Sequence, residues 1–416
     1  MTAAHLTRPA GPAAATAGPV TGGGAPPRLP FVVYVLAAGT FLMLTTEFVV
    51  AGLLPEIAGD LQVSVARAGL LITVFAAGMI VGAPTMALLT RRVPRRVTLM
   101  TALAVFAVGH VVVALGDSFP LLLAARFGTA WATGAFWSVA SVAATRAAGP
   151  GASARALGLV GAGGMLANVV GVPLGAFAGQ LSGWRGPFWA LAALALAAVP
   201  LIARHVPRAG DDQQSVSLRS ELGAMRSGRL WLVLAACAAT TGGVLSAYSY
   251  VSPLLTDRAG IAPGWVPLVL VGFGVGSLIG TIVGGRLGDV RPHATTIAVA
   301  ASTTAVLLAI CVLSAHPVPT VLLVVLLGLI GLSANPVLSA LAVRFAGVAP
   351  TLGVAMSVSA YNLGTAVGSG VAGRALDSGL GATGPAVVGT ILAALTLIPT
   401  IAIALLQRRS PSGGRP

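Results

Sequence analysis

The chain has 416 residues, of which 56% are hydrophobic and only 8% are charged. Soluble domains carry about 25% charged residues, so this composition excludes a water-soluble globular protein. The formal net charge is +14 with no lysine, so all 24 basic residues are arginine. Because a positive charge can also indicate binding to nucleic acid, the positions of the arginines decide its meaning.

Apolar segments follow one another along the whole chain, each close to or above the ~20 residues that cross ~30 Å of hydrocarbon. Lipid offers no water to unpaired backbone groups, so we expect each segment to be a helix. The segments are 31–54, 66–89, 97–116, 120–144, 154–179, 187–203, 230–255, 264–285, 294–314, 318–343, 350–376 and 384–407. The sequence therefore predicts an all-α polytopic membrane protein with twelve transmembrane helices.

The arginines fall mainly on one side of these spans. With the N-terminus in the cytoplasm, nineteen lie on the cytoplasmic side, and only Arg67, Arg185, Arg258 and Arg374 lie outside. This is the positive-inside rule, which predicts a multi-pass protein of the plasma membrane with both termini in the cytoplasm. The basic charge thus indicates topology in a lipid bilayer and no nucleic-acid partner.

The segments outside the spans carry no sign of a further domain. Residues 1–30 are rich in Ala, Gly, Pro and Thr without an apolar h-region, so we expect a disordered cytoplasmic tail and no cleavable signal peptide. Residues 408–416 are expected to form a second cytoplasmic tail. Cys237 and Cys311 lie in spans without a Cys-x-x-Cys pair, so neither a disulfide framework nor a metal site is indicated.

The longest internal polar stretch, residues 204–229, separates six spans from six. A shift of 198 residues places Pro253 on Pro55, and it superposes further small residues: Gly276 on Gly78, Gly280 on Gly82 and Gly285 on Ala87. We therefore predict an N-terminal half (31–203), a cytoplasmic loop (204–229) and a C-terminal half (230–407). Two parallel six-span repeats are typical of a major facilitator transporter, whose substrate site lies between the halves.

Three ionisable residues stand out inside the spans, namely Glu47, His110 and Arg126. A charged form at the bilayer centre costs at least ~2.5–3.5 kcal/mol, so such residues usually face a cavity and carry function. Glu47 corresponds to Leu245 in the second half, so the acid is not part of the repeated scaffold. We expect Glu47 to carry a proton. His110 is either a relay or, more commonly for such a residue, packed and hydrogen-bonded.

Polar residues of other spans are candidates for a substrate cavity. Interhelical hydrogen bonding would explain any one of them equally well. They are Asn168, Tyr248, Tyr250, Asn335, Tyr361 and Asn362.

The loop after span 8 reads GGRLGDVRP (284–292) and resembles the G-x-L-x-D-R-x-G-R-R loop of the major facilitator superfamily, at Gly285, Leu287 and Asp289. The first-half counterpart, ALLTRRVPRR (87–96), keeps Arg95 and Arg96 but has Arg91 in place of the acid. In that family the acid helps to lock the cytoplasmic side. The alternative is that these arginines only set topology.

Two further motifs resemble the drug-exporting branch of this superfamily. GVPLGAFAG (171–179) resembles its antiporter signature in a variant spacing, at Gly171, Pro173 and Gly175; the alternative is plain close packing of helices. RFGTAWATG (126–134) resembles R-x-x-Q-G, which implies a role for Arg126 in proton transfer. The alternative is an Arg126 satisfied by backbone carbonyls of span 1.

Several blocks over 31–407 are similar to those of actinobacterial chloramphenicol exporters, in the twelve-span drug:proton antiporter branch. They are TTEFVVAGLLPEIAGDLQVS, GVPLGAFAG with GWRGPFW, and SYVSPLLTDRAG followed by GWVPLVLVGFGVGSLIG. The resemblance implies monomeric, proton-driven efflux of a small amphipathic compound by alternating access, without a cofactor. A sugar or nucleoside exporter, an uptake permease and a non-transporting sensor remain as alternatives. An enzyme is disfavoured, because no nucleophile–base–orienter set can be assembled.

Overall fold

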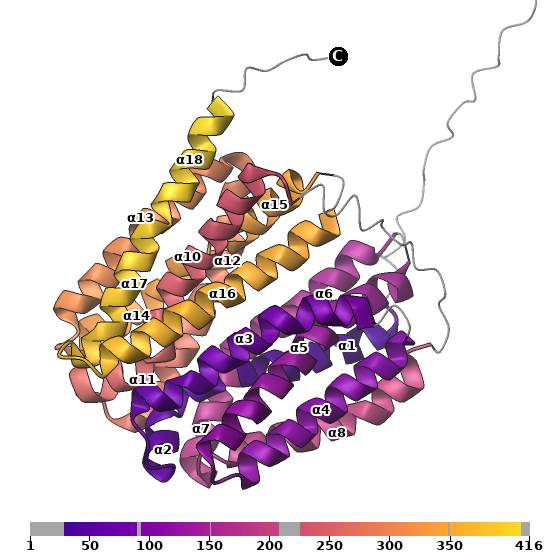
Figure 1. The fold of residues 1–416 in the computed structure, drawn as a ribbon, viewed down its shortest axis with the longest axis horizontal. Coiled ribbons are helices and arrows are strands. Elements are labelled where there is room, and N and C mark those ends of the chain that lie inside the picture. The colour runs from indigo at the N-terminus through magenta and orange to yellow at the C-terminus, as the bar shows by residue number, and fades with distance from the viewer. Residues whose placement is uncertain (1–28, 90–92, 150, 208–224, 348–349, 409–416) are drawn as a thin grey trace, which may run out of the picture.

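The computed structural model describes residues 29–89, 93–149, 151–207, 225–347 and 350–408 (Figure 1). Within these ranges the regular elements are all helices, which confirms the predicted all-α class. Most of the predicted tails and of the central loop lie outside the described residues. The predicted cytoplasmic placement of both termini remains a prediction.

The N-terminal helices begin and end close to the predicted spans. They are α1 (Phe31–Val49), η1 (Val50–Gly52), α2 (Leu54–Asp60), α3 (Val65–Leu89), α4 (Arg95–Leu115), α5 (Phe119–Ala148), α6 (Ser153–Leu166), η2 (Ala167–Gly171), α7 (Val172–Ser182) and α8 (Gly186–His205). Prolines or glycines mark many of these ends, because proline fits the first helical turn and lacks the N–H that a helix interior needs.

The C-terminal helices repeat this order. They are α10 (Gly228–Ser249), α11 (Val251–Pro253), η3 (Leu254–Arg258), η4 (Pro263–Trp265), α12 (Val266–Val290), α13 (Pro292–Leu313), α14 (Pro317–Gly331), α15 (Asn335–Phe345), α16 (Pro350–Leu376), η5 (Gly381–Thr383), α17 (Gly384–Leu395) and α18 (Leu397–Arg408). The two sets of helices lie side by side as two bundles (Figure 1).

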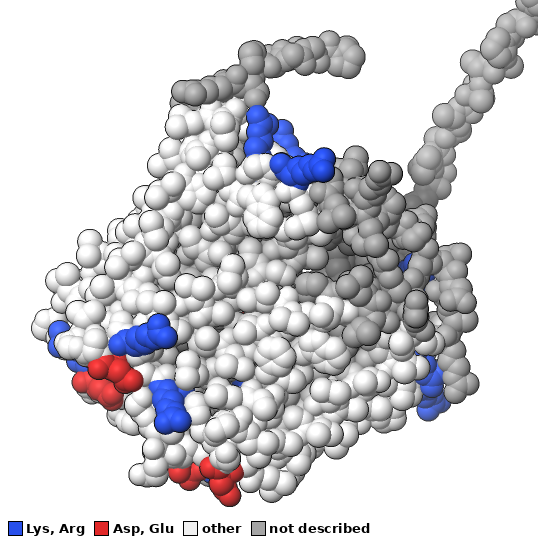
Figure 2. All heavy atoms as spheres, in the orientation of Figure 1, with Lys and Arg blue, Asp and Glu red and all other residues white. Residues whose placement is uncertain are grey.

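Ten helical segments of the described chain are long and apolar enough to cross a membrane. The other two predicted spans are α5 and α16, helices of 30 and 27 residues. Both are buried against neighbours, α5 against α3 and α4, and α16 against α10 and α3. On the face in view, Figure 2 shows a broad uncharged area across the bundles, with the acids gathered toward the end where α2 lies.

Glycine ridges bring helices together inside each half. A Cβ at Gly171, Gly175 or Gly179 would meet side chains of the first span in the same half. If Gly276 carried a side chain, its Cβ would lie only 2.8 Å from the carbonyl oxygen of Val325 on α14, so only glycine allows this approach. These ridges therefore serve close packing within a half.

Different residues join the halves. A Cβ on Gly274 would lie 2.6 Å from the carbonyl oxygen of Asn168, where α12 meets η2. Tyr250 of the C-terminal half packs on Gly69 of α3 and Gly373 of α16. These contacts close the seam between the bundles toward the end that carries Asp60.

Candidate functional site: a cavity between the halves

A cavity of about 180 Å³ lies between the two bundles, and both contribute to its wall. Six of the predicted residues meet there: Glu47, Asn168, Tyr248, Asn335, Tyr361 and Asn362. The remaining lining residues carried no sequence signal, because aromatic, aliphatic and threonine side chains are common in any span. They are Phe48, Thr241, Leu245, Phe273, Leu332 and Thr365.

Aromatic rings form one wall of this cavity. The Tyr248 ring stacks on Phe273 with ring centroids 4.2 Å apart, and Phe48 meets Tyr248 edge-on at 5.8 Å. Phe48 comes from α1 and the other two rings from α10 and α12, so the cluster bridges the halves. Offset and edge-to-face pairs of this kind are favourable and leave ring surface for an apolar ligand group.

Another part of the wall carries neutral polar side chains whose oxygens can accept hydrogen bonds. The Asn362 amide nitrogen donates to the Val358 carbonyl at 3.0 Å, which identifies its other amide atom as oxygen. That oxygen, the side-chain oxygen of Asn335 and the Thr241 hydroxyl have no hydrogen-bond partner among the described residues. Buried acceptors without partners are costly, so this wall favours a ligand with N–H or O–H groups.

Several helices are interrupted where they reach the cavity. The α-helical part of α1 ends at Val49, two residues after Glu47, and continues as the 3₁₀ turn η1. Asn168 lies in the π-helical turn η2, just before Pro173. The break between α14 and α15 places Leu332 and Asn335 at the wall. Such interruptions are tolerated at membrane depth only where protein or a cavity surrounds them.

Arg126 lies behind α1, inside the N-terminal bundle, with 1% of its surface exposed. Its Nη1 donates to the Thr46 hydroxyl at 2.8 Å, and longer contacts of 3.4 Å reach the carbonyls of Glu47 and Leu71. The guanidinium also lies 4.3 Å from the Phe75 ring centroid. Arg126 is therefore held by the Thr46 side chain of span 1 and by one backbone carbonyl each from spans 1 and 2, and its role in proton transfer stays a prediction.

His110 and Tyr250 do not line the cavity, contrary to the prediction. His110 is buried between the Phe106 and Phe188 rings, and its Nε2 lies 2.7 Å from the Thr46 hydroxyl. Tyr250 follows the end of α10 and points to α16, where its hydroxyl donates to the Ser369 carbonyl at 3.1 Å. Tyr250 lies two positions beyond Tyr248, so its side chain points in a different direction. The residue type alone does not reveal that direction.

Side chains link the halves on the Asp60 side of the cavity. Thr73 and Ser369 share a hydrogen bond of 2.8 Å between α3 and α16. Gln180 donates to the Pro263 carbonyl at 2.7 Å, and the Ser64 hydroxyl donates to Asp377 at 3.2 Å. With the packing of Tyr250, these contacts seal the seam at this end.

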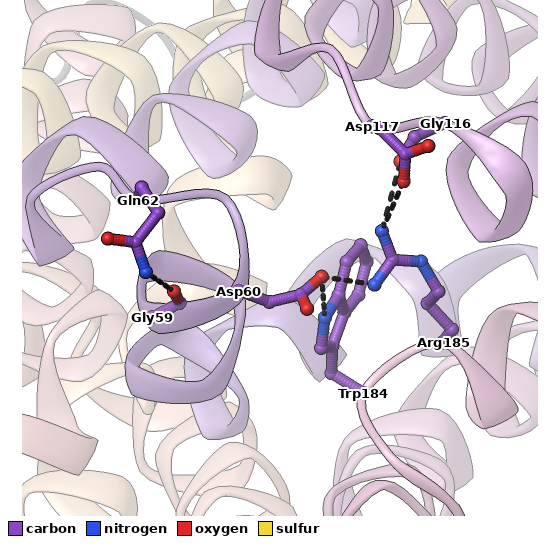
Figure 3. A network of polar contacts seen from close by, with 7 residues as sticks. All are labelled: Gly59, Asp60, Gln62, Gly116, Asp117, Trp184 and Arg185. Atoms are coloured by element: carbon purple, nitrogen blue, oxygen red, sulfur yellow. Dashed lines mark hydrogen bonds and ion pairs between the residues drawn. The ribbon is translucent and has the colours of Figure 1, made fainter.

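An arginine-centred network holds the same end of the N-terminal half together (Figure 3). Arg185 forms ion pairs with Asp60 and Asp117, donates to the Gly116 carbonyl and lies over the Trp184 ring. The Trp184 indole N–H also donates to Asp60 at 3.1 Å. The hydrogen bond from Arg185, helped by the one from Trp184, holds the pKa of Asp60 below its usual value.

The loop-motif residues lie at the opposite end of the bundles. Gly285 and Asp289 line a pocket of about 190 Å³ together with Arg344 of α15. Arg95 and Arg96 begin α4. Arg91 lies outside the described residues, as do residues 90 and 92, so the first-half lock stays a prediction.

The sequence profile of the Major Facilitator Superfamily matches residues 36–357. The chain belongs to this superfamily. It is 36% identical to a chloramphenicol resistance protein of Streptomyces lividans, over 89% of this chain and 95% of the relative. It is 32% identical to the inner membrane transport protein YdhP of Escherichia coli K12, with the same coverage.

Solved structures agree with this major facilitator fold. A bacterial homologue of the human lysosomal transporter Spinster aligns with a TM-score of 0.69, 16% identity and coverage of 90% of this chain and 95% of that one. The fucose:proton symporter of Escherichia coli aligns with a TM-score of 0.61 and 17% identity, covering 90% and 98%. This major facilitator protein is thus a transporter of the inner membrane and not an enzyme.

Proposed function

We propose that this transporter exports a small, uncharged amphipathic compound of the chloramphenicol type in exchange for protons. The observation that carries the proposal is the position of Glu47, the one acidic side chain among the residues that line the cavity between the halves. A carboxylate at membrane depth is costly unless it has a function. The similarity to a chloramphenicol resistance protein supports the substrate class.

Glu47 and the substrate share one cavity, so protonation and substrate release are coupled by competition for it. When Glu47 is ionised, its charge lies near Arg126. Arg126 contacts α1 on the side away from the cavity, where it donates to the Thr46 hydroxyl and the Glu47 carbonyl. When Glu47 is protonated, the cavity loses its charge. The seam at the Asp60 side is closed in this structure, and alternating access requires it to open in turn.

The walls suit a compound with an aromatic ring and a few hydrogen-bond donors. The ring would pack against Phe48, Tyr248 and Phe273, and the donors would reach the oxygens of Asn362, Asn335 and Thr241. Chloramphenicol combines a nitrophenyl ring with two hydroxyls and an amide N–H. A sugar or nucleoside would use the same donors with less of the aromatic wall, so it is the second candidate for this site.

The test replaces Glu47 by Gln, which preserves shape and removes the charge. Glu56→Gln is the matched control, because Glu56 lies nine residues further along in α2 and does not line the cavity. In everted vesicles, wild type and the control should accumulate chloramphenicol when the membrane is energised, and a protonophore should abolish the uptake. Glu47→Gln should lose this uptake while remaining folded; undiminished uptake would refute the role of Glu47.

The same vesicles separate the alternatives. An uptake permease would move the compound in the opposite direction, so intact cells rather than everted vesicles would accumulate it. A sugar or nucleoside exporter would leave chloramphenicol transport at background, while labelled sugars or nucleosides would be carried. A sensor would carry none of these compounds.

A further inference from the structure

A chain of hydrogen bonds runs from Arg126 through Thr46 to His110, inside the N-terminal bundle. Arg126 Nη1 lies 2.8 Å from the Thr46 hydroxyl oxygen, which lies 2.7 Å from His110 Nε2. His110 Nδ1 lies 2.7 Å from the Phe106 carbonyl oxygen. All three side chains are at most 1% exposed, so these contacts are not shared with bulk water.

With a neutral His110, the donors and acceptors allow only one direction along this chain. The Phe106 carbonyl can only accept, so His110 Nδ1 carries a hydrogen and donates. Arginine can only donate, so the Thr46 oxygen accepts from Arg126. The Thr46 hydrogen is then available to His110 Nε2, which accepts as the unprotonated nitrogen of a neutral imidazole.

A protonated His110 would break this order. Both ring nitrogens would donate, the Thr46 hydrogen would lose its acceptor, and a second cation would lie beside Arg126 in a dry site. The other groups packed on the imidazole, the rings of Phe106 and Phe188, accept no proton and carry no charge. His110 is therefore suited to hold a hydrogen bond and not to carry a proton.

Other threonines on the same helix show what His110 changes. The hydroxyls of Thr40 and Thr45 donate to carbonyls of their own helix, four residues earlier, as threonine commonly does. The Thr46 hydrogen turns to His110 instead, which leaves the oxygen lone pairs directed at Arg126. Thr46 also provides the shortest hydrogen bond of Arg126 among the described residues.

We propose that Thr46 and His110 are positioning residues, which hold Arg126 against α1 for proton exchange at the adjacent Glu47. This inference rests on the proposed proton-coupled function. It assigns His110 a fixed neutral state with the hydrogen on Nδ1, and it excludes His110 from the path of the transported proton.

The first test reads the state of His110 without any transport. In ¹⁵N-histidine-labelled protein in nanodiscs, the His110 signals, assigned by their loss in His110→Gln, should show a neutral ring with Nδ1 protonated from pH 5 to 8. Thr46→Val should shift the Nε2 signal, because its hydrogen bond is lost. A His110 that titrates in this range, or that carries its hydrogen on Nε2, would overturn the inference whatever the protein transports.

The second test separates positioning from folding and from substrate binding. In proteoliposomes, Thr46→Val should lower proton-driven chloramphenicol transport by about 10- to 100-fold, the scale of a misplaced functional group. Thr46→Ser should restore it, and Thr40→Val should match wild type. Chloramphenicol affinity should stay unchanged in all of them, because neither threonine lines the cavity.

The outcomes distinguish this inference from the proposed function. A wild type that does not transport chloramphenicol refutes the substrate of the proposed function, while the NMR result still decides the state of His110. A wild type that transports, with a Thr46→Val variant that is folded and equally fast, overturns the positioning role. Loss of transport with a proportional loss of substrate affinity would also overturn it.

Discussion

Replacement of Arg185 by Gln should weaken the Asp60 end of the N-terminal half. Arg185 joins three chain segments: the end of α2 through Asp60, the α4–α5 connection through Asp117 and the Gly116 carbonyl, and its own α7–α8 connection through Trp184 (Figure 3). Gln is too short and uncharged to keep these contacts. The segments would then be held by the packing of the helices and by the hydrogen bond from Trp184 to Asp60.

The expected loss is about 2–4 kcal/mol in the free energy of unfolding. The Asp60 and Asp117 side chains are 45% and 92% exposed, so water screens both ion pairs to about 0.2–1 kcal/mol each. The hydrogen bond to Gly116 at 3.2 Å contributes about 1 kcal/mol. The Trp184 ring, 4.3 Å from the guanidinium carbon, adds about 0.5–1 kcal/mol.

Detergent-solubilised wild type and variant can be compared by chemical unfolding followed by circular dichroism. Arg67→Gln is the matched control, since Arg67 at the same end lies over the Phe119 ring at 5.4 Å. That single contact is worth less than 1 kcal/mol at an exposed site. Equal losses in the two variants would refute the idea that Arg185 acts through a network.

The pH dependence gives a second check on Asp60. Because its folded-state pKa lies below the ordinary value of 3.8, the Asp60 share of the stabilisation is present above pH 4 and is lost as the pH falls through the folded-state pKa. The difference between wild type and Arg185→Gln should therefore be constant from pH 5 to 8 and shrink below about pH 4. A difference that grows on acidification would contradict this sign.

Three further predictions concern the cavity and the seam. Gly274→Ala should push the halves apart and increase opening at the Asp60 end, which spin-label distances across the seam would measure. Gly276→Ala is the control: it should lower the stability of the C-terminal half without that opening. Tyr250→Phe should remove the bond to Ser369, costing about 1 kcal/mol, and leave chloramphenicol affinity unchanged in a binding titration. Asn362→Leu should weaken chloramphenicol binding about tenfold, for one lost hydrogen bond. Stability should change by less than about 1 kcal/mol, because the loss of the hydrogen bond to Val358 is offset by the removal of a buried oxygen without a partner.

The sequence predicts the helices well because span length and apolar content are set by the bilayer. It also identifies Glu47 and five cavity residues, since polar groups inside a span must lie against protein or a cavity. The sequence does not show which residues of the two halves lie close to one another. Asn168 and Asn335 meet only because their helices are interrupted at the same depth, and no local pattern encodes that.

The mistaken assignments have a common physical cause. Tyr250 and His110 satisfy their polar atoms with partners inside their own half, Ser369 and Thr46. Polarity within a span shows that a partner exists without showing whether it is a ligand or another helix. Nothing in the sequence distinguishes Thr46 from other threonines in the spans. A threonine in a helix usually bonds to its own backbone, so the role of Thr46 depends on where His110 lies.

The glycines illustrate how the structure separates packing from motion. The Gly171–Gly175–Gly179 ridge and Gly276 press helices of one half together, so these contacts can persist while the halves move. Gly274 instead lets backbone of one half approach backbone of the other, at η2 beside Asn168. An opening of the seam must break this second kind of contact and spare the first. Small residues that look alike in sequence therefore divide into those that pack helices within one bundle and those, such as Gly274 and Gly69, that let the two bundles approach each other.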